Sequence, residues 1–218
     1  MGGDERRAQI AAAAERIARE RGLAAVTLRA VAAELEVGSA LVAHHAPSMD
    51  DVVAAAFDAI VGAELADLAE LADAAEIAGA GMPPGRGADA VAALAAVLNT
   101  LLDGSRADVT LVWVQSWALG GRNAVLAARV RAQMDAWTRF LADIVRSGVE
   151  AGRFRAEDPE ALAAQMLGMI DGLNAHALVS WHDGTERMRL MALSVGAMLG
   201  VDAADLLRAG AAARLPSP

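Results

Sequence analysis

The stretch of sequence that decides the fold is TLRAVAAELEVGSALVAHHAPS, residues 27–48. Its first residue, a threonine, is a favourable N-cap for a short helix over residues 27–35. Residues 36–38 include a glycine and predict a turn, and the serine that follows can cap a second short helix over residues 39–46. Two short helices that are joined by a tight turn and preceded by a packing helix predict a helix-turn-helix.

The second helix of this pair carries side chains suited to reading DNA. In a helix-turn-helix, the N-terminal residues of the second helix meet base edges in the major groove. Ser39, Ala40 and Leu41 open that helix here. Small residues permit close approach, the hydroxyl can hydrogen-bond a base or a phosphate, and the leucine can touch a thymine methyl group.

Four further residues complete the candidate DNA contacts. Thr27 and Arg29 begin the first helix of the pair, where free backbone N–H groups favour phosphate. His44 and His45 close the second helix. Short helices and glycine turns occur in any helical bundle, so the spacing alone leaves a plain structural role open.

The rest of the chain is also predicted to be helical, because Ala, Leu, Arg and Glu dominate it. The clearest loop is residues 78–87, and residues 214–218 are expected to fray. Ser48 and Asp51 form a plausible capping box for a long helix. We expect an all-α, two-domain protein with nine helices, over residues 4–21, 27–35, 39–46, 48–77, 88–103, 106–119, 123–151, 159–182 and 185–208.

Composition excludes several classes of protein. The chain has 218 residues, a formal net charge of −9, and no Cys. The absence of cysteine excludes a disulfide framework, a Cys-ligated zinc site and a thiol nucleophile. The N-terminal residues lack the apolar segment that is typical of a signal peptide. The longest uncharged stretches are too short to span a bilayer. We therefore expect a cytoplasmic protein that does not bind membranes.

The negative charge argues weakly against a nucleic-acid partner, but it is unevenly distributed. Residues 1–47, which we call the head, hold six Arg and six acidic residues and are neutral. All seven aromatic residues lie after residue 56. This asymmetry predicts a small head of short helices and a larger helical body.

A set of residues in the head follows a familiar spacing without a gap. It comprises Ile10, Ala13-Ala14, Gly22, Thr27, Val31-Ala32, Val37, Ala40-Leu41-Val42, His45 and Pro47-Ser48. This pattern resembles the N-terminal signature of TetR-type repressors. Trp113–Trp117, Arg153 and Ile170–Leu173 are weakly similar to the BetI-like branch of effector domains.

The resemblance implies a helix-turn-helix DNA-binding domain over residues 1–48 and a ligand-binding and dimerisation domain over residues 49–218. It implies a homodimer that binds a near-palindromic operator on double-stranded DNA. Binding of a small-molecule effector would release this dimer from the DNA. By position, Thr27 and His45 match phosphate contacts, and residues 39–41 match the groove-facing start of the recognition helix. The effector's identity does not follow from the resemblance.

Several positions depart from the family's pattern. Ala43 stands where Tyr is usual, and Ala46 and Ala18 stand where aromatic rings are usual. Met49 replaces a Lys, Glu36 replaces a turn Gly, and Gly38 replaces a Ser. These changes remove a hydroxyl donor, a positive charge and core volume. The alternative is therefore a ligand-binding or interaction protein that keeps the fold but binds DNA weakly or not at all.

The body contains a candidate effector pocket with apolar walls and few polar groups. Asp171 and Asn174 are its polar candidates, since a ligand can supply the partners that buried polar groups need. The same residue types also occur as plain core. The candidate ligand-binding residues are Trp113, Trp117, Met134, Trp137, Asp171 and Asn174.

The last two predicted helices are candidates for the dimer interface. Both carry apolar faces at helical spacing, and Gly168, Gly172, Gly196 and Gly200 permit close approach of a second helix. Two such helices from each chain would form a four-helix interface, although the same faces can finish a monomer core.

Little in the sequence points to an enzyme. No Glu-x-x-His or His-Glu-x-x-His pattern occurs, and no glycine-rich phosphate loop follows a strand. We expect no catalytic residues, no metal site and no cofactor.

Overall fold

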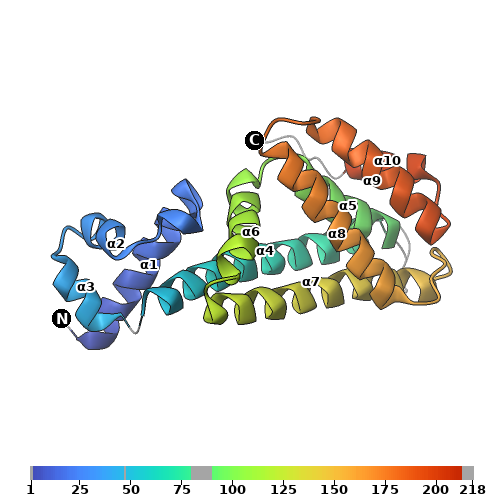
Figure 1. Cartoon of the computed structure of the whole chain (residues 1–218). Helices are drawn as coiled ribbons and strands as arrows, with labels where there is room; N and C mark the ends of the chain where they lie inside the picture. Colours follow the sequence, from blue (N-terminus) through green and yellow to red (C-terminus); the bar gives the residue numbers. More distant parts are fainter. Residues whose placement is uncertain (1, 47, 80–89, 213–218) are drawn as a thin grey trace. The chain divides into compact units, whose positions relative to one another are not determined.

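The computed structural model describes residues 2–46, 48–79 and 90–212 (Figure 1). These ranges contain helices and no strand, which confirms the predicted all-α class. The helices are α1 (Gly3–Arg21), the 3-10 turn η1 (Leu23–Ala25), α2 (Leu28–Glu34), α3 (Ser39–His45), α4 (Met49–Gly79), α5 (Ala90–Leu102), α6 (Ala107–Gly120), α7 (Ala124–Glu150), α8 (Pro159–Ala177), α9 (Gly184–Leu199) and α10 (Ala203–Ala212).

The described residues form ten α-helices rather than nine, because the predicted last helix is two helices. α9 ends at Leu199, and the φ of 69° at its C-cap, Gly200, lies in the left-handed region that favours glycine. The Asp202 carboxylate then accepts a hydrogen bond of 2.8 Å from the Ala204 N–H and begins α10. The predicted eighth helix also ends early, at Ala177 instead of residue 182.

The caps explain the other boundaries. Thr27 accepts a hydrogen bond of 3.1 Å from the Ala30 N–H, as predicted. Ser48 accepts one of 3.0 Å from the Asp51 N–H, and its hydroxyl donates to the Asp51 carboxylate. The prediction that Ser39 caps α3 was wrong: Gly38 is the N-cap, and no side chain bonds there.

Two predicted irregular segments fall mostly beyond the described ranges. α4 continues to Gly79, so only residues 80–87 of the predicted loop remain, and they lie outside the described residues. The predicted tail at residues 214–218 also lies outside them.

The chain divides into two compact units. Unit 1 comprises residues 1–64 and 108–134, and unit 2 comprises residues 65–107 and 135–218. The units follow packing: unit 1 combines α1–α3 with α6, the first part of α4 and the first part of α7. The functional division at residue 48 stays a prediction.

The core of unit 1 forms around one face of α1. Ile10, Ala13, Ala14 and Ile17 are buried at helical spacing, as the sequence predicts. Val31 from α2 and Val42 from α3 are also fully buried. α1, α2 and α3 all contact one another, which fixes the two short helices as a pair.

The core of unit 2 forms around α5. Eleven of the thirteen residues of α5 are buried, because α8, α9 and α10 all pack against it. Arg187 of α9 is buried too, and it donates three hydrogen bonds to backbone carbonyls. Two of these go to Leu102, the last residue of α5, so a guanidinium satisfies the C-terminal end of that helix.

Candidate functional site

The turn between α2 and α3 is tight and strained. α2 ends at Glu34, and the Val37 N–H donates to the Ala32 carbonyl at 2.9 Å. Glu36 has a φ of 54°, in the left-handed region where a β-carbon is unfavourable. This conformation explains why glycine is usual at that turn position, and Glu36 accepts the strain instead.

The start of α3 is open to solvent. Ser39, Ala40 and Leu41 are all exposed, and 36% of the Leu41 side chain is accessible. Val42, the next residue, is fully buried and anchors the helix in unit 1. The three candidate base-contacting residues therefore lie together on the free side of an anchored helix, as a recognition helix requires.

The other candidate DNA contacts differ in their freedom to bind. Arg29 is exposed near the start of α2, whereas the Thr27 hydroxyl already caps that helix. His44 is exposed and His45 is half-buried, and their ring centroids lie 4.9 Å apart in an edge-on arrangement.

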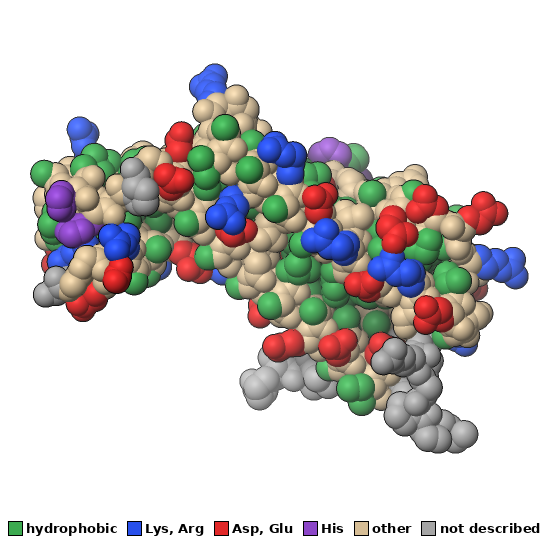
Figure 2. All heavy atoms as spheres, turned by 90° about the horizontal axis from the view of Figure 1, so that it is seen from below, with side chains coloured by type: hydrophobic (Ala, Val, Ile, Leu, Met, Phe, Trp, Pro, Cys, Tyr) green, Lys and Arg blue, Asp and Glu red, His purple; other side chains and the backbone are tan. Residues whose placement is uncertain are grey.

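Most basic side chains of the head have partners close by. Arg7 pairs with Asp4, Arg16 with Glu34 at 3.0 Å, and Arg19 with Glu15 at 3.4 Å. On the face drawn in Figure 2, acidic and basic side chains are interspersed over the head and do not form a basic patch. Paired charges attract phosphate less than free ones, because the carboxylate cancels much of the field.

Gln115 of α6 contacts the head in a way that the sequence did not indicate. Its side-chain oxygen accepts a hydrogen bond of 2.8 Å from the Ala24 N–H. Gly22 has a φ of 83°, which favours glycine, and a β-carbon there would lie 2.5 Å from that oxygen and displace the Gln115 amide. Nothing local in the sequence indicates this contact, because Ala24 and Gln115 are far apart in the chain.

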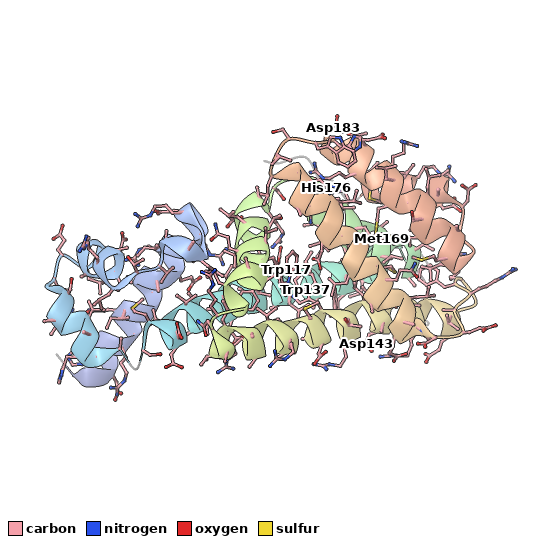
Figure 3. All side chains as sticks on the ribbon, in the orientation of Figure 1. Trp117, Trp137, Asp143, Met169, His176 and Asp183 are labelled. Atoms are coloured by element: carbon pink, nitrogen blue, oxygen red, sulfur yellow. The ribbon has the colours of Figure 1, made fainter. Side chains whose placement is uncertain are left out.

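Three candidate effector residues lie in unit 1. Trp113 is half-buried and packs edge-on against the buried Phe57, with ring centroids 5.1 Å apart. Trp117 is 37% exposed and lies 6.1 Å from Trp113 on the same helix, projecting from α6 (Figure 3). Met134 of α7 is equally exposed. The exposed apolar surfaces of Trp117 and Met134 are available for contact with a ligand.

The other three candidates lie in unit 2. Trp137 is 2% exposed and contacts Phe140 edge-on, which is the environment of a core residue. Asp171 and Asn174 are half-buried on α8. Burial raises the pKa of Asp171 from its ordinary value of 3.8 to about 7. Among the described residues, Asp171 has no hydrogen-bond partner and no ion-pair partner. Its carboxyl group can therefore bind a ligand.

The described residues hold no group of three or more side chains suited to a metal ion. In the same part of the chain, every helix is too short or too polar to cross a membrane. An α3 whose start is exposed, packed against α1 and α2 in a helix-turn-helix, is typical of DNA-binding domains.

The comparisons with known proteins narrow this class to one family. Residues 10–56 match the description "Bacterial regulatory proteins, tetR family", and residues 90–199 match "BetI-type transcriptional repressor, C-terminal". The second match spans half of the chain. The chain belongs to the TetR family of transcriptional regulators, with a BetI-type C-terminal region.

Solved structures share the fold. A transcriptional regulator from Rhodococcus sp. Rha1 is 24% identical, with a TM-score of 0.69, over 87% of this chain and 94% of that one. A protein of Saccharomonospora viridis, crystallised with choline, is 23% identical, with a TM-score of 0.65, over 90% and 98%. RolR in complex with resorcinol is 20% identical, with a TM-score of 0.58, over 99% and 96%. No curated protein matches the sequence.

Proposed function

We propose that the protein is a ligand-responsive transcriptional repressor that binds a near-palindromic operator as a homodimer and leaves it when a small molecule binds. The observation that carries this proposal is the exposed row Ser39, Ala40 and Leu41 on an anchored α3, in a chain of the TetR family. Such a protein acts in the cytoplasm, on DNA, without catalysing a reaction.

The operator is tested with the full chain and the DNA upstream of its own coding sequence, in a gel-shift assay at low salt. We expect a shift that salt weakens and that Leu41→Glu abolishes, since a carboxylate in the major groove repels phosphate and finds no donor where the leucine met a methyl group. Ala128→Leu, at an exposed position on α7, is the matched control and should leave the shift unchanged. A folded dimer that shifts no DNA at any salt concentration would favour the alternative, a fold-retaining ligand-binding protein.

The homodimer is supported by an open face on α8 and α9. A β-carbon at Gly168 or at Gly172 would meet no atom within 4 Å, so these glycines leave space beside the helix rather than within the fold. Leu193 on α9 is 51% exposed. Apolar side chains and small residues on neighbouring helices suit a four-helix interface with a second copy.

Gly168→Leu tests this interface without disturbing the chain's own packing. The leucine has room in a single chain but keeps a second helix at a distance, so we expect the dimer to dissociate in analytical ultracentrifugation. Gly168→Ala is the control: its small side chain should preserve the dimer while raising helix stability by about 1 kcal/mol. If the dimer survives both Gly168→Leu and Leu193→Glu, its interface is formed by another surface of the chain.

The class of effector is inferred from Asp171. A half-buried carboxyl without a described partner favours a small organic cation, because such a ligand supplies the missing charge. The choline bound by the Saccharomonospora viridis protein is of this class. Calorimetric titration of choline at pH 6 and pH 8 should show tighter binding at pH 8, where Asp171 is ionised, and Asp171→Asn should remove the difference. Equal affinity at both pH values would exclude this role for Asp171.

A further inference from the structure

A cavity of about 360 Å³ that is open to solvent lies within unit 1, where the end of α3 meets the start of α4. α1 and the start of α7 complete its walls. The walls are mostly apolar and include Ile10, Ala46, Val52 and Val125. None of the six candidate effector residues is among its walls.

The cavity exists because small side chains meet there. Ala11 of α1, Ala46 at the C-cap of α3, and Ala54 and Ala55 of α4 present only methyl groups to the space. Protein interiors are otherwise close-packed, and an apolar cavity of about 150 Å³ already suffices to bind benzene. The space is therefore large enough for an aromatic ring.

The polar groups of the cavity favour an anion. Arg7, His45 and Arg129 contribute donors, and Asp51 is the one acid that the cavity wall contains. The Asp51 carboxylate already accepts a hydrogen bond from the hydroxyl of Ser48, the residue that caps α4. Both arginines have a carboxylate partner, since Arg7 pairs with Asp4 and Arg129 lies 3.5 Å from Asp58. Each guanidinium has five N–H donors, so donors remain for a further anion.

We propose that this cavity is a ligand site for a small aromatic carboxylate, separate from the effector residues of the body. The ring would lie among the alanine side chains, and the carboxylate would accept hydrogen bonds from Arg129 and Arg7, which match its geometry. Benzoate and 1-naphthoate are the probes that this chemistry selects.

The site would be coupled to DNA through His45, which lines the cavity and is a candidate phosphate contact. This coupling rests on the proposed function, whereas the ligand site does not. A carboxylate beside His45 competes with a DNA phosphate for the imidazole, and its negative charge repels that phosphate. The ligand therefore lowers affinity for DNA, and by linkage DNA lowers affinity for the ligand by the same factor.

Calorimetric titration of the full chain without DNA tests the site directly. We expect benzoate or 1-naphthoate to bind at least about tenfold more tightly than the uncharged amide of the same ring, a difference of about 1.4 kcal/mol. Arg129→Gln should remove that preference while leaving binding of the amide unchanged. Failure of both carboxylates to bind would overturn the proposal.

Filling the cavity gives an independent test. Ala46→Phe places a ring in the space, so it should abolish binding. Ala55→Leu, from an exposed position on α4, blocks the same space if Ala46→Phe does not fold, and Ala59→Leu is the control on the same helix away from the cavity. Unchanged binding in a folded cavity-filling variant would overturn the site.

The DNA arm separates the two proposals. Benzoate that binds the wild type but not the filled variant, and that weakens the gel shift only in the wild type, supports the site and its coupling. Benzoate that binds in this way to a chain that shifts no DNA supports the site and overturns the repressor. Benzoate that weakens the shift equally in both chains acts elsewhere and overturns the coupling.

Discussion

At the scale of single residues, Glu36 has a strained backbone conformation that lowers the stability of the fold. Its φ of 54° forces a side chain into the left-handed region, at a cost of roughly 1–2 kcal/mol. Glu36→Gly removes this strain, and the greater freedom of glycine in the unfolded chain offsets part of the gain. We expect urea denaturation to show a free energy of unfolding that is higher by about 1 kcal/mol.

Two controls separate strain from charge in this experiment. Glu36→Gln removes the charge but keeps the β-carbon, so it should leave stability nearly unchanged. Glu20→Gly, at an exposed position inside α1, should lower the free energy of unfolding by about 1 kcal/mol, because glycine weakens a helix. If Glu36→Gln stabilises as much as Glu36→Gly, charge rather than strain is the cause.

Asp171 predicts a second effect at this scale, on the pH dependence of stability. Its pKa is about 7 in the folded chain and near 3.8 when unfolded. Between these values the folded state keeps a proton that the unfolded state has released, so stability falls as pH rises from about 4 to 7. The slope from this one group is at most about 1.4 kcal/mol per pH unit.

Asp171→Asn should remove this slope, because an amide does not titrate. Denaturation at pH 5 and pH 8 measures it: we expect the variant to gain more stability over the wild type at pH 8 than at pH 5. Asp135→Asn changes the same charge at an exposed position on α7 and should leave the wild-type slope intact. An unaltered slope in Asp171→Asn would assign the pH dependence to other groups.

At the scale of elements, the junction of α5 and α9 depends on Arg187. Its guanidinium donates to the Leu102 carbonyl at 2.7 and 3.1 Å and to the His182 carbonyl at 2.7 Å. Arg187→Met keeps the aliphatic volume but leaves these buried carbonyls without donors. We expect the free energy of unfolding to fall by about 3 kcal/mol, measured by urea denaturation.

Arg189, on the same helix, provides the matched control. It is exposed and pairs only with Glu186, so Arg189→Met should cost well under about 1 kcal/mol. Arg187→Lys keeps the charge with fewer donors and should fall between the two variants. If Arg187→Met and Arg189→Met lower the free energy of unfolding equally, the buried hydrogen bonds of Arg187 do not stabilise the fold.

The same junction shows what sequence can predict about elements. Helix periodicity, glycine and Thr27 gave the fold class, α1 and the two short helices, because those signals are local. The break at Gly200 was missed, since a glycine within an apolar helical pattern also suits close helix packing. Arg187 was missed altogether, because nothing local distinguishes a buried arginine from a solvent-exposed one on a helix.

At the scale of the whole molecule, the candidate site was only partly predictable. The exposed start of α3 agrees with the pattern that singled out Ser39, Ala40 and Leu41. The candidate effector residues divide equally between the two units, and Trp137 lies in the core. Periodicity places a tryptophan on a buried face but does not say whether a ligand or another helix covers it. The cavity arises because alanines of α1 and α4 meet Ala46 at the C-cap of α3, and no single stretch of sequence records this coincidence.

Charge is the other property of the whole chain, and it sets how the protein should bind DNA. Four of the six head arginines already have hydrogen-bond or ion-pair partners: Arg6, Arg7, Arg16 and Arg19. Arg29 is exposed at the start of α2, and it has neither a hydrogen-bond partner nor an ion-pair partner among the described residues. Few phosphates are then neutralised per half-site, so we expect operator affinity to depend less steeply on salt than in a protein with a basic head.

Arg29→Ala tests this expectation quantitatively. Each lost phosphate contact reduces the slope of log K against log salt by about 0.9, so a dimer that loses two should show a slope shallower by about 1.8, with weaker binding to every sequence. Fluorescence anisotropy of a labelled operator over a range of salt concentrations measures both quantities. Arg139→Ala, an exposed arginine outside the helix-turn-helix, should change neither. A slope that Arg29→Ala leaves unchanged would mean that backbone N–H groups, rather than this side chain, hold the phosphate at α2.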